Sequence, residues 1–106
     1  MLEKLTRFET SEQTTPGTVY YRNTYDQVKA AVYAAAKTIG MEVKNHNDNH
    51  KEFLLKHGGV EIIVTAFNIT ILETAVDLVV MTPLMTSGKK VAEKFFGAMR
   101  AHTQPK

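Results

Sequence analysis

The chain has 106 residues and a mass of 11.9 kDa, which is enough for one domain, because so short a chain cannot bury the apolar surface that two cores need. With 13 Lys and Arg against 11 Asp and Glu, it lacks the basic excess of a dedicated nucleic-acid binder, and we expect no specific nucleic-acid partner. The absence of cysteine excludes a disulfide framework, a thiolate nucleophile and any cysteine-bound metal.

No part of the sequence has the ~20 apolar residues of a membrane-spanning helix, so we expect no membrane span. The first residues, MLEKL, are too charged and contain too few apolar side chains for a secretory signal. We therefore expect a cytoplasmic protein. The alternative is the bacterial envelope, if a signal segment was removed, because residues 9–18 have the polar, Ser- and Thr-rich composition of a tether.

Residues 18–23 (TVYYRN) are mostly β-branched or aromatic and follow a Pro-Gly pair, which predicts a strand that begins after a turn. Thr24 then stands where a helix N-cap belongs. Apolar residues recur at helical spacing over 25–39, and Gly40 follows the last of them, so the sequence predicts a helix that ends there.

After this helix, apolar residues recur at every second position, which is the spacing of a strand and not of a helix. Residues 41–44 and 53–55 alternate around a polar turn and predict a hairpin. The longer runs 60–67 and 69–81 alternate as well and predict a second hairpin, with Asn68 between them.

The last strand is expected to end at Pro83, and Ser87 can cap a C-terminal helix with a wide apolar face. The sequence therefore predicts a two-layer α+β sandwich in the order β-α-β-β-β-β-α, with two helices on one face of an antiparallel sheet of four to five strands. The domain is expected to span residues 18–101. Residues 1–17 would form a flexible segment or an extra strand, and residues 102–106 a frayed tail.

In this register, the sheet face that the helices leave open carries apolar side chains among polar ones. Such a face on a small domain indicates either partial burial in an interface or the ordinary scatter of surface hydrophobes. We expect a homodimer or a protein partner, because closed homodimers are the commonest assembly. The interface candidates are Leu54, Ile63, Phe67 and Val79.

Two histidines and an acid lie close together in the predicted polar turn. His46 and His50 flank Asp48, and these three side chains could converge on a divalent metal. However, so few ligands on a turn tip bind a metal weakly unless other side chains support them, and Asn, Asp and His are common in turns for backbone reasons. We therefore expect no metal and no other cofactor.

The start of the C-terminal helix combines a glycine with two lysines, as phosphate-binding loops do. The P-loop pattern itself is absent, because Pro83 stands where its first glycine belongs and Lys90 where its Ser or Thr belongs. An anion or small-ligand site is the alternative here. Its candidate residues are Ser87, Gly88, Lys89 and Lys90.

The sequence offers little for catalysis. Its only serines, Ser11 and Ser87, stand outside a Gly-x-Ser-x-Gly context. Glu73 and Asp77 share one strand face but lie ~13 Å apart, which is too far for a retaining glycosidase pair. We expect no enzymatic activity.

Three segments of the chain form a recognisable pattern: residues 22–28 (RNTYDQV), 38–43 (TIGMEV) and 73–78 (ETAVDL). A polar turn and a strand pair lie between the second and third segments, and a helix follows the third. This pattern resembles a family of small, uncharacterised single-domain bacterial proteins, often lipoproteins. They are similar in outline to the helix-grip modules of outer-membrane assembly lipoproteins. The resemblance covers about residues 18–101 and implies the fold and no catalytic residues. The chain differs from exported members in having no lipid-attachment cysteine.

The sequence therefore favours a noncatalytic binding or assembly module that uses the open sheet face or a sheet edge to self-associate or to engage a partner protein. The alternative is a small-ligand or anion-binding carrier or sensor. Its site would lie between the first helix and the sheet, or at the start of the C-terminal helix.

Overall fold

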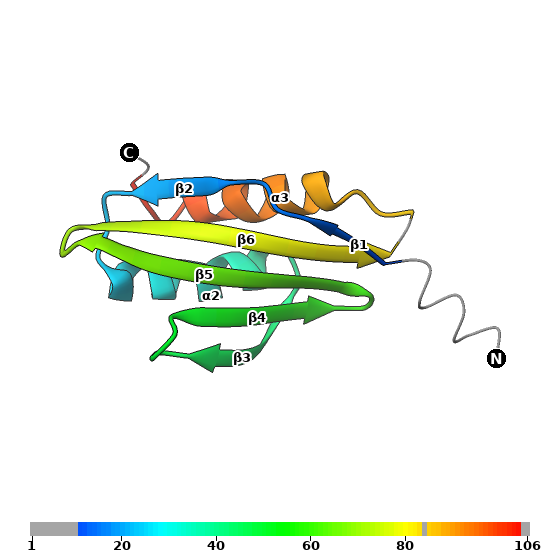
Figure 1. Cartoon of the computed structure of the whole chain (residues 1–106), viewed down its shortest axis with the longest axis horizontal. Helices are drawn as coiled ribbons and strands as arrows, with labels where there is room; N and C mark the ends of the chain where they lie inside the picture. Colours follow the sequence, from blue (N-terminus) through cyan, green and yellow to red (C-terminus); the bar gives the residue numbers. More distant parts are fainter. Residues whose placement is uncertain (1–10, 84, 105–106) are drawn as a thin grey trace.

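Alternating apolar residues fold most of this chain into one antiparallel sheet, and two helices cover one face of it (Figure 1). The structure is a computed structural model that describes residues 11–83 and 85–104. Its elements are β1 (Ser11–Thr14), β2 (Thr18–Tyr21), α2 (Tyr25–Thr38), β3 (Glu42–Asn47), β4 (Glu52–His57), β5 (Val60–Thr70), β6 (Glu73–Pro83) and α3 (Gly88–Arg100). From β2 onward this is the predicted two-layer α+β order.

The sheet has six strands in the order β1-β6-β5-β4-β3, and β2 pairs with a second length of β6. Tyr21 lies opposite Thr74 near the start of β6, and Thr14 lies opposite Val80 near its end. The strand beyond the predicted number is β1, which forms within the segment expected to be flexible or an extra strand. Residues 1–10 of that segment lie outside the described residues.

Helix α2 begins and ends where the sequence predicts. Thr24 and Gln27 form a capping box: the Thr24 hydroxyl accepts from the Gln27 N–H at 3.2 Å, and Gln27 Oε1 accepts from the Thr24 N–H at 3.0 Å. Beyond its C-terminal end, Gly40 has a φ of 77°, a conformation that glycine adopts without strain.

The turn between β5 and β6 lies elsewhere than expected. β5 continues to Thr70, so the turn consists of Ile71 and Leu72. Asn68 pairs within the ladder, and the register shifts by one residue between Asn68 and Thr70. The turn preference of a single Asn is outweighed here, because the β-branched residues beyond it extend the hydrogen-bonded ladder.

The core lies between the sheet and the helices, where alternate residues of β4, β6 and the first part of β5 are buried. The largest fully buried side chains are Tyr21, Phe53, Phe95, Leu55, Ile62, Leu78, Met99, Val28, Val32, Val64, Val76 and Val80. The intervening strand residues point to the opposite face. They include Leu54, Ile63, Phe67 and Val79, which lie on the face that the sequence predicts.

The chain beyond α3 returns to the connection between β2 and α2. The Gln104 N–H donates to Asn23 Oδ1, and the Gln104 carbonyl accepts from the Arg22 N–H, both at 2.7 Å. Residues 102–104 belong to the tail that we expected to fray, and the sequence gives no sign of these contacts. Residues 105–106 lie outside the described residues. No helix in the described ranges is long and apolar enough to cross a membrane.

Candidate functional site

Apolar side chains cross the open face of the sheet in two rows, at positions directly opposite one another on neighbouring strands. The row nearer the β4–β5 turn consists of Leu54, Ile63 and Val79. The row nearer the β5–β6 turn consists of Tyr20, Ala75 and Phe67. We call the two rows together the apolar face.

The apolar face is accessible to solvent. Tyr20 and Phe67 are each 45% exposed, and between them Ala75 is only 2% exposed. The first row is half-buried by its own neighbours. Both helices lie behind the sheet, and no described element covers the open side (Figure 1). A polar row of Glu52, Thr65, Asp77 and Thr18 runs between the two apolar rows. A mixed surface with solvent-accessible apolar side chains is compatible with an interaction site.

Charged side chains on the open side of the sheet have polar partners within the chain. Lys56 Nζ lies 3.3 Å from Glu61 Oε2 on the neighbouring strand. The Asp77 carboxylate accepts a hydrogen bond from the Thr18 hydroxyl. Pairing of this kind lowers the cost of removing water from the charged groups when another surface covers the face.

The β5–β6 turn exposes aliphatic side chains beyond the apolar face. Ile69 is 48% exposed, Leu72 is 68% exposed and Ile71 is 85% exposed. We call these three residues the hairpin tip. Sequence reasoning missed it, because two-residue hairpin turns are recognised by Gly and Asn, and Ile-Leu carries no such signal.

A shallow hollow of about 220 Å³ lies at the other end of the open face, between β3 and β5. Leu54 and Ile63 of the apolar face line one side of it, and polar residues of β3 and β4 line the other. We call it the face groove, and its remaining lining residues are Asn45, His46, Asn47, Glu52 and Phe53.

The two edges of the sheet are less suited to pairing with another strand. On β3, the Asn45 side chain accepts the His46 N–H at 2.8 Å, and the register shifts between Val43 and Asn45. On the other edge, β1 and β2 have four residues each and are separated by a segment containing Pro16. Bulges, side-chain capping and short strands all oppose edge pairing. The face is therefore the better surface for association.

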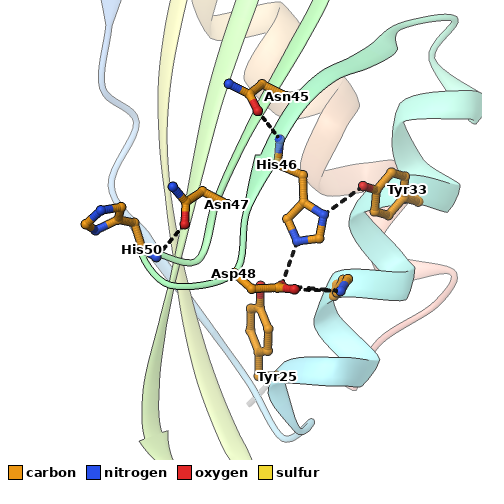
Figure 2. Close-up of polar contacts among 8 residues, drawn as sticks. Tyr25, Tyr33, Asn45, His46, Asn47, Asp48 and His50 are labelled. Atoms are coloured by element: carbon orange, nitrogen blue, oxygen red, sulfur yellow. Dashed lines mark hydrogen bonds and ion pairs between the residues drawn. The ribbon is translucent and has the colours of Figure 1, made fainter.

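A polar cluster ties the β3–β4 turn to α2 (Figure 2). Asp48 Oδ1 lies 3.0 Å from the Tyr25 hydroxyl, 3.3 Å from Lys29 Nζ and 2.7 Å from His46 Nε2. These hydrogen bonds, that of His46 foremost, lower the pKa of Asp48 from 3.8 to about 2. Burial and then the nearby Asp48 carboxylate raise the pKa of Tyr25 to about 12.

His46 connects this cluster to the core. Its ring stacks on Phe53 with centroids 4.8 Å apart, and its Nδ1 lies 3.0 Å from the Tyr33 hydroxyl. If Nε2 donates to the Asp48 carboxylate, Nδ1 of the neutral ring accepts the Tyr33 proton. His46 thus links Tyr33 to Asp48 through two hydrogen bonds, one at each ring nitrogen.

The three metal-ligand candidates do not converge. His46 and Asp48 meet, whereas the His50 side chain points away from them (Figure 2) and its N–H donates to Asn47 Oδ1 at 3.1 Å. Within the described residues, no group of three His, Cys, Asp or Glu side chains is placed to hold a metal. Tyr25 and Lys29 were missed as partners of Asp48, and Tyr33 was missed as a partner of His46. Their spacing of four residues marks one helix face but does not show what that face meets.

The start of α3 is already occupied by the chain itself. The Ser87 hydroxyl accepts from the Lys90 N–H at 3.2 Å. Gly88 is buried, and a Cβ atom at that position would lie 2.8 Å from Thr14 Oγ1 of β1. Lys89 and Lys90 are exposed. The four candidate residues therefore lie together, and Gly88 packs against Thr14 of β1.

No family model matches this chain, and no curated protein matches it. The resemblance to small bacterial lipoprotein domains therefore stays a prediction.

Proposed function

We propose that this chain is a noncatalytic assembly module that associates with a second copy of itself through the apolar face. The observation that supports this most strongly is the pair of apolar rows that cross three strands each on the uncovered side of the sheet. Burial of exposed apolar area is the main favourable contribution to protein association.

The size of the face suits a homodimer. β5 and β6 have 11 residues each and the other four strands have four to six, so at ~3.3 Å along and ~4.8 Å across the strand for each residue the open face measures roughly 700 Å². Full overlap would therefore cover roughly 700 Å² on each copy, close to the ~800 Å² per partner of an ordinary stable interface.

A second copy also suits the chemistry of the face. Two-fold symmetry brings the same surface of both copies together, so the apolar rows of one copy can meet those of the other. Two sheets can stack face to face with their side chains interdigitated ~10 Å apart. The internal pairing of Lys56 with Glu61 keeps those charges from opposing the contact.

The proposal is tested by placing a charge on the face and measuring the molar mass in solution by light scattering. Ile63→Glu should convert the dimer to a monomer, because two buried carboxylates would be left unpaired. The matched control is Ala30→Glu, which adds the same charge at an exposed position on α2 and should leave the dimer intact.

Phe67→Glu repeats the test at a position that is 45% exposed and therefore easily tolerated by the monomer fold. A dimer that survives both face variants, each shown to be folded by circular dichroism, contradicts the proposal. The anion-binding alternative predicts a different result, in which Lys89→Glu with Lys90→Glu abolishes phosphate binding and the face variants do not affect it.

A further inference from the structure

The hairpin tip projects from one end of the molecule. Its side chains Ile69, Leu72 and Ile71 are 48%, 68% and 85% exposed. The β5–β6 turn that carries them lies at the left end of the long axis in Figure 1. Residues 69–73 pair with no described strand outside this hairpin. The tip is therefore a narrow, convex apolar end of the sheet.

The chain around the tip is suited to an environment without water. Residues 62–72 (IIVTAFNITIL) contain no charged side chain. Within the turn, the Leu72 N–H donates to Thr70 Oγ1 at 3.2 Å, so this backbone donor has a partner in the chain itself. A backbone group that is already paired leaves water at a lower cost than an unpaired one.

A polar hollow of about 550 Å³ lies directly behind the tip. Leu72, Thr70 and Glu73 line it from the hairpin, and Arg22 is among the lining residues that the rest of the chain contributes. Arg22 is exposed, and a guanidinium group matches the geometry of a phosphate. The apolar tip thus adjoins a polar surface that carries a group able to bind phosphate.

The size and shape of the tip favour a membrane over a protein as its partner. Each partner in an ordinary protein complex loses ~800 Å² of surface to a complementary face, and three side chains at a narrow end offer far less. A bilayer accepts a convex tip without matching its shape, because each apolar side chain that enters it contributes through its own buried area.

We infer that the hairpin tip inserts into the surface of a phospholipid bilayer, with Ile71 and Leu72 among the acyl chains and Arg22 at the level of the phosphates. Glu73 follows Leu72 directly, and insertion stops there because a carboxylate is costly to move out of water. The tip lies outside the two apolar rows, so this inference goes beyond self-association and does not depend on it.

The small size of the tip also predicts the strength of binding. A single myristoyl chain gives only reversible membrane binding, with a constant of ~10⁴ M⁻¹. The tip buries less apolar area than such a chain. We therefore expect reversible binding, with half of the protein bound at roughly millimolar lipid.

The chain contains no tryptophan, so a single tryptophan reports insertion without a background. Ile71→Trp should show blue-shifted emission with vesicles of phosphatidylcholine and phosphatidylserine, and quenching when the acyl chains are brominated. Met85→Trp is the matched control, because Met85 is 93% exposed and lies beyond the opposite end of β6. Its emission should not change.

Co-sedimentation with the same vesicles tests the tip without a new aromatic ring. Ile71→Glu should lower the binding constant at least tenfold, because a carboxylate would have to enter the acyl region. Met85→Glu adds the same charge at the other end of the molecule and should bind like the unmodified chain. Both positions are exposed, so both variants should fold, which circular dichroism checks.

The position of Arg22 has its own test. Arg22→Gln should weaken binding to the phosphatidylserine vesicles about fivefold, which is the contribution of one basic residue near an anionic surface. Lys90→Gln removes the same charge from an exposed position at the start of α3 and should weaken binding less than twofold. Equal weakening by the two variants would overturn the placement of Arg22 at the phosphates.

The outcomes decide the inference independently of self-association. Loss of binding in Ile71→Glu but not in Met85→Glu, with a spectral change only in Ile71→Trp, supports insertion of the tip. The inference is wrong if the unmodified chain ignores vesicles at several times the expected lipid concentration, or if the variants at positions 71 and 85 behave alike. Sedimentation of the chain without lipid measures self-association separately.

Discussion

At the scale of single residues, Asp48 organises the contact between the β3–β4 turn and α2. Its carboxylate accepts hydrogen bonds from Tyr25, Lys29 and His46, which belong to two different elements. The pair of His46 and Asp48 was recognisable in the sequence as a possible ligand set, but Tyr25 and Lys29 are far from it in the chain. Only the packing of the helix against the hairpin brings them together, and their predicted helix gave no information on that contact.

The lowered pKa of Asp48 predicts a pH dependence of stability. The folded state favours the ionised carboxylate, with a pKa of about 2 against 3.8, so its contribution is complete above pH 3.8 and is lost as the pH falls towards 2. The difference in urea midpoint between the native chain and Asp48→Asn should therefore shrink over this range. A difference that grows as the medium becomes more acidic would contradict this assignment.

Phe53 lies in the core and Phe67 lies on the apolar face, so truncating each residue should have a different effect. Phe53 is 1% exposed, and truncation to Ala should lower the free energy of unfolding by about 3–5 kcal/mol. Phe67 is 45% exposed, and the same truncation should cost the monomer about 1 kcal/mol or less while weakening association. Chemical denaturation of dilute protein measures the first effect. Equal losses for both variants would place Phe67 in the core.

At the scale of elements, local signals predicted the helices well. Thr24 and Gly40 delimit α2, and Ser87 caps α3, because capping depends on residues that are neighbours in the chain. Strand alternation correctly assigned Ile63 to the open face. The β5–β6 turn was predicted at the wrong residue, and β1 was only one of two alternatives for residues 1–17. Both are decided by pairing with β6, and a cross-strand partner leaves no mark on the local sequence.

Two glycines of α3 test how this helix packs. Gly97 has no atom within 4 Å of an added Cβ, so Gly97→Ala should raise the free energy of unfolding by about 0.5–1 kcal/mol through helix propensity. Gly88→Ala should instead lower it by about 1 kcal/mol or more, because the new methyl group meets Thr14. Thermal unfolding of both variants measures the contrast. A gain in stability for Gly88→Ala would show that β1 does not press against α3 as described.

At the scale of the whole molecule, the two faces of the sheet differ in what they contact. The helix-covered side holds the core, while the open side presents two apolar rows, a shallow groove and an exposed aliphatic turn. The sequence predicted which residues face the open side, because alternation alone determines it. It did not predict the groove or the tip, since both depend on where the strands end relative to one another.

Self-association is tested most directly by sedimentation equilibrium of the unmodified chain, from low to high micromolar concentration. We predict a weight-average mass that rises with concentration from 11.9 kDa towards twice that value. A mass that stays at 11.9 kDa over the whole range would contradict assembly through the apolar face.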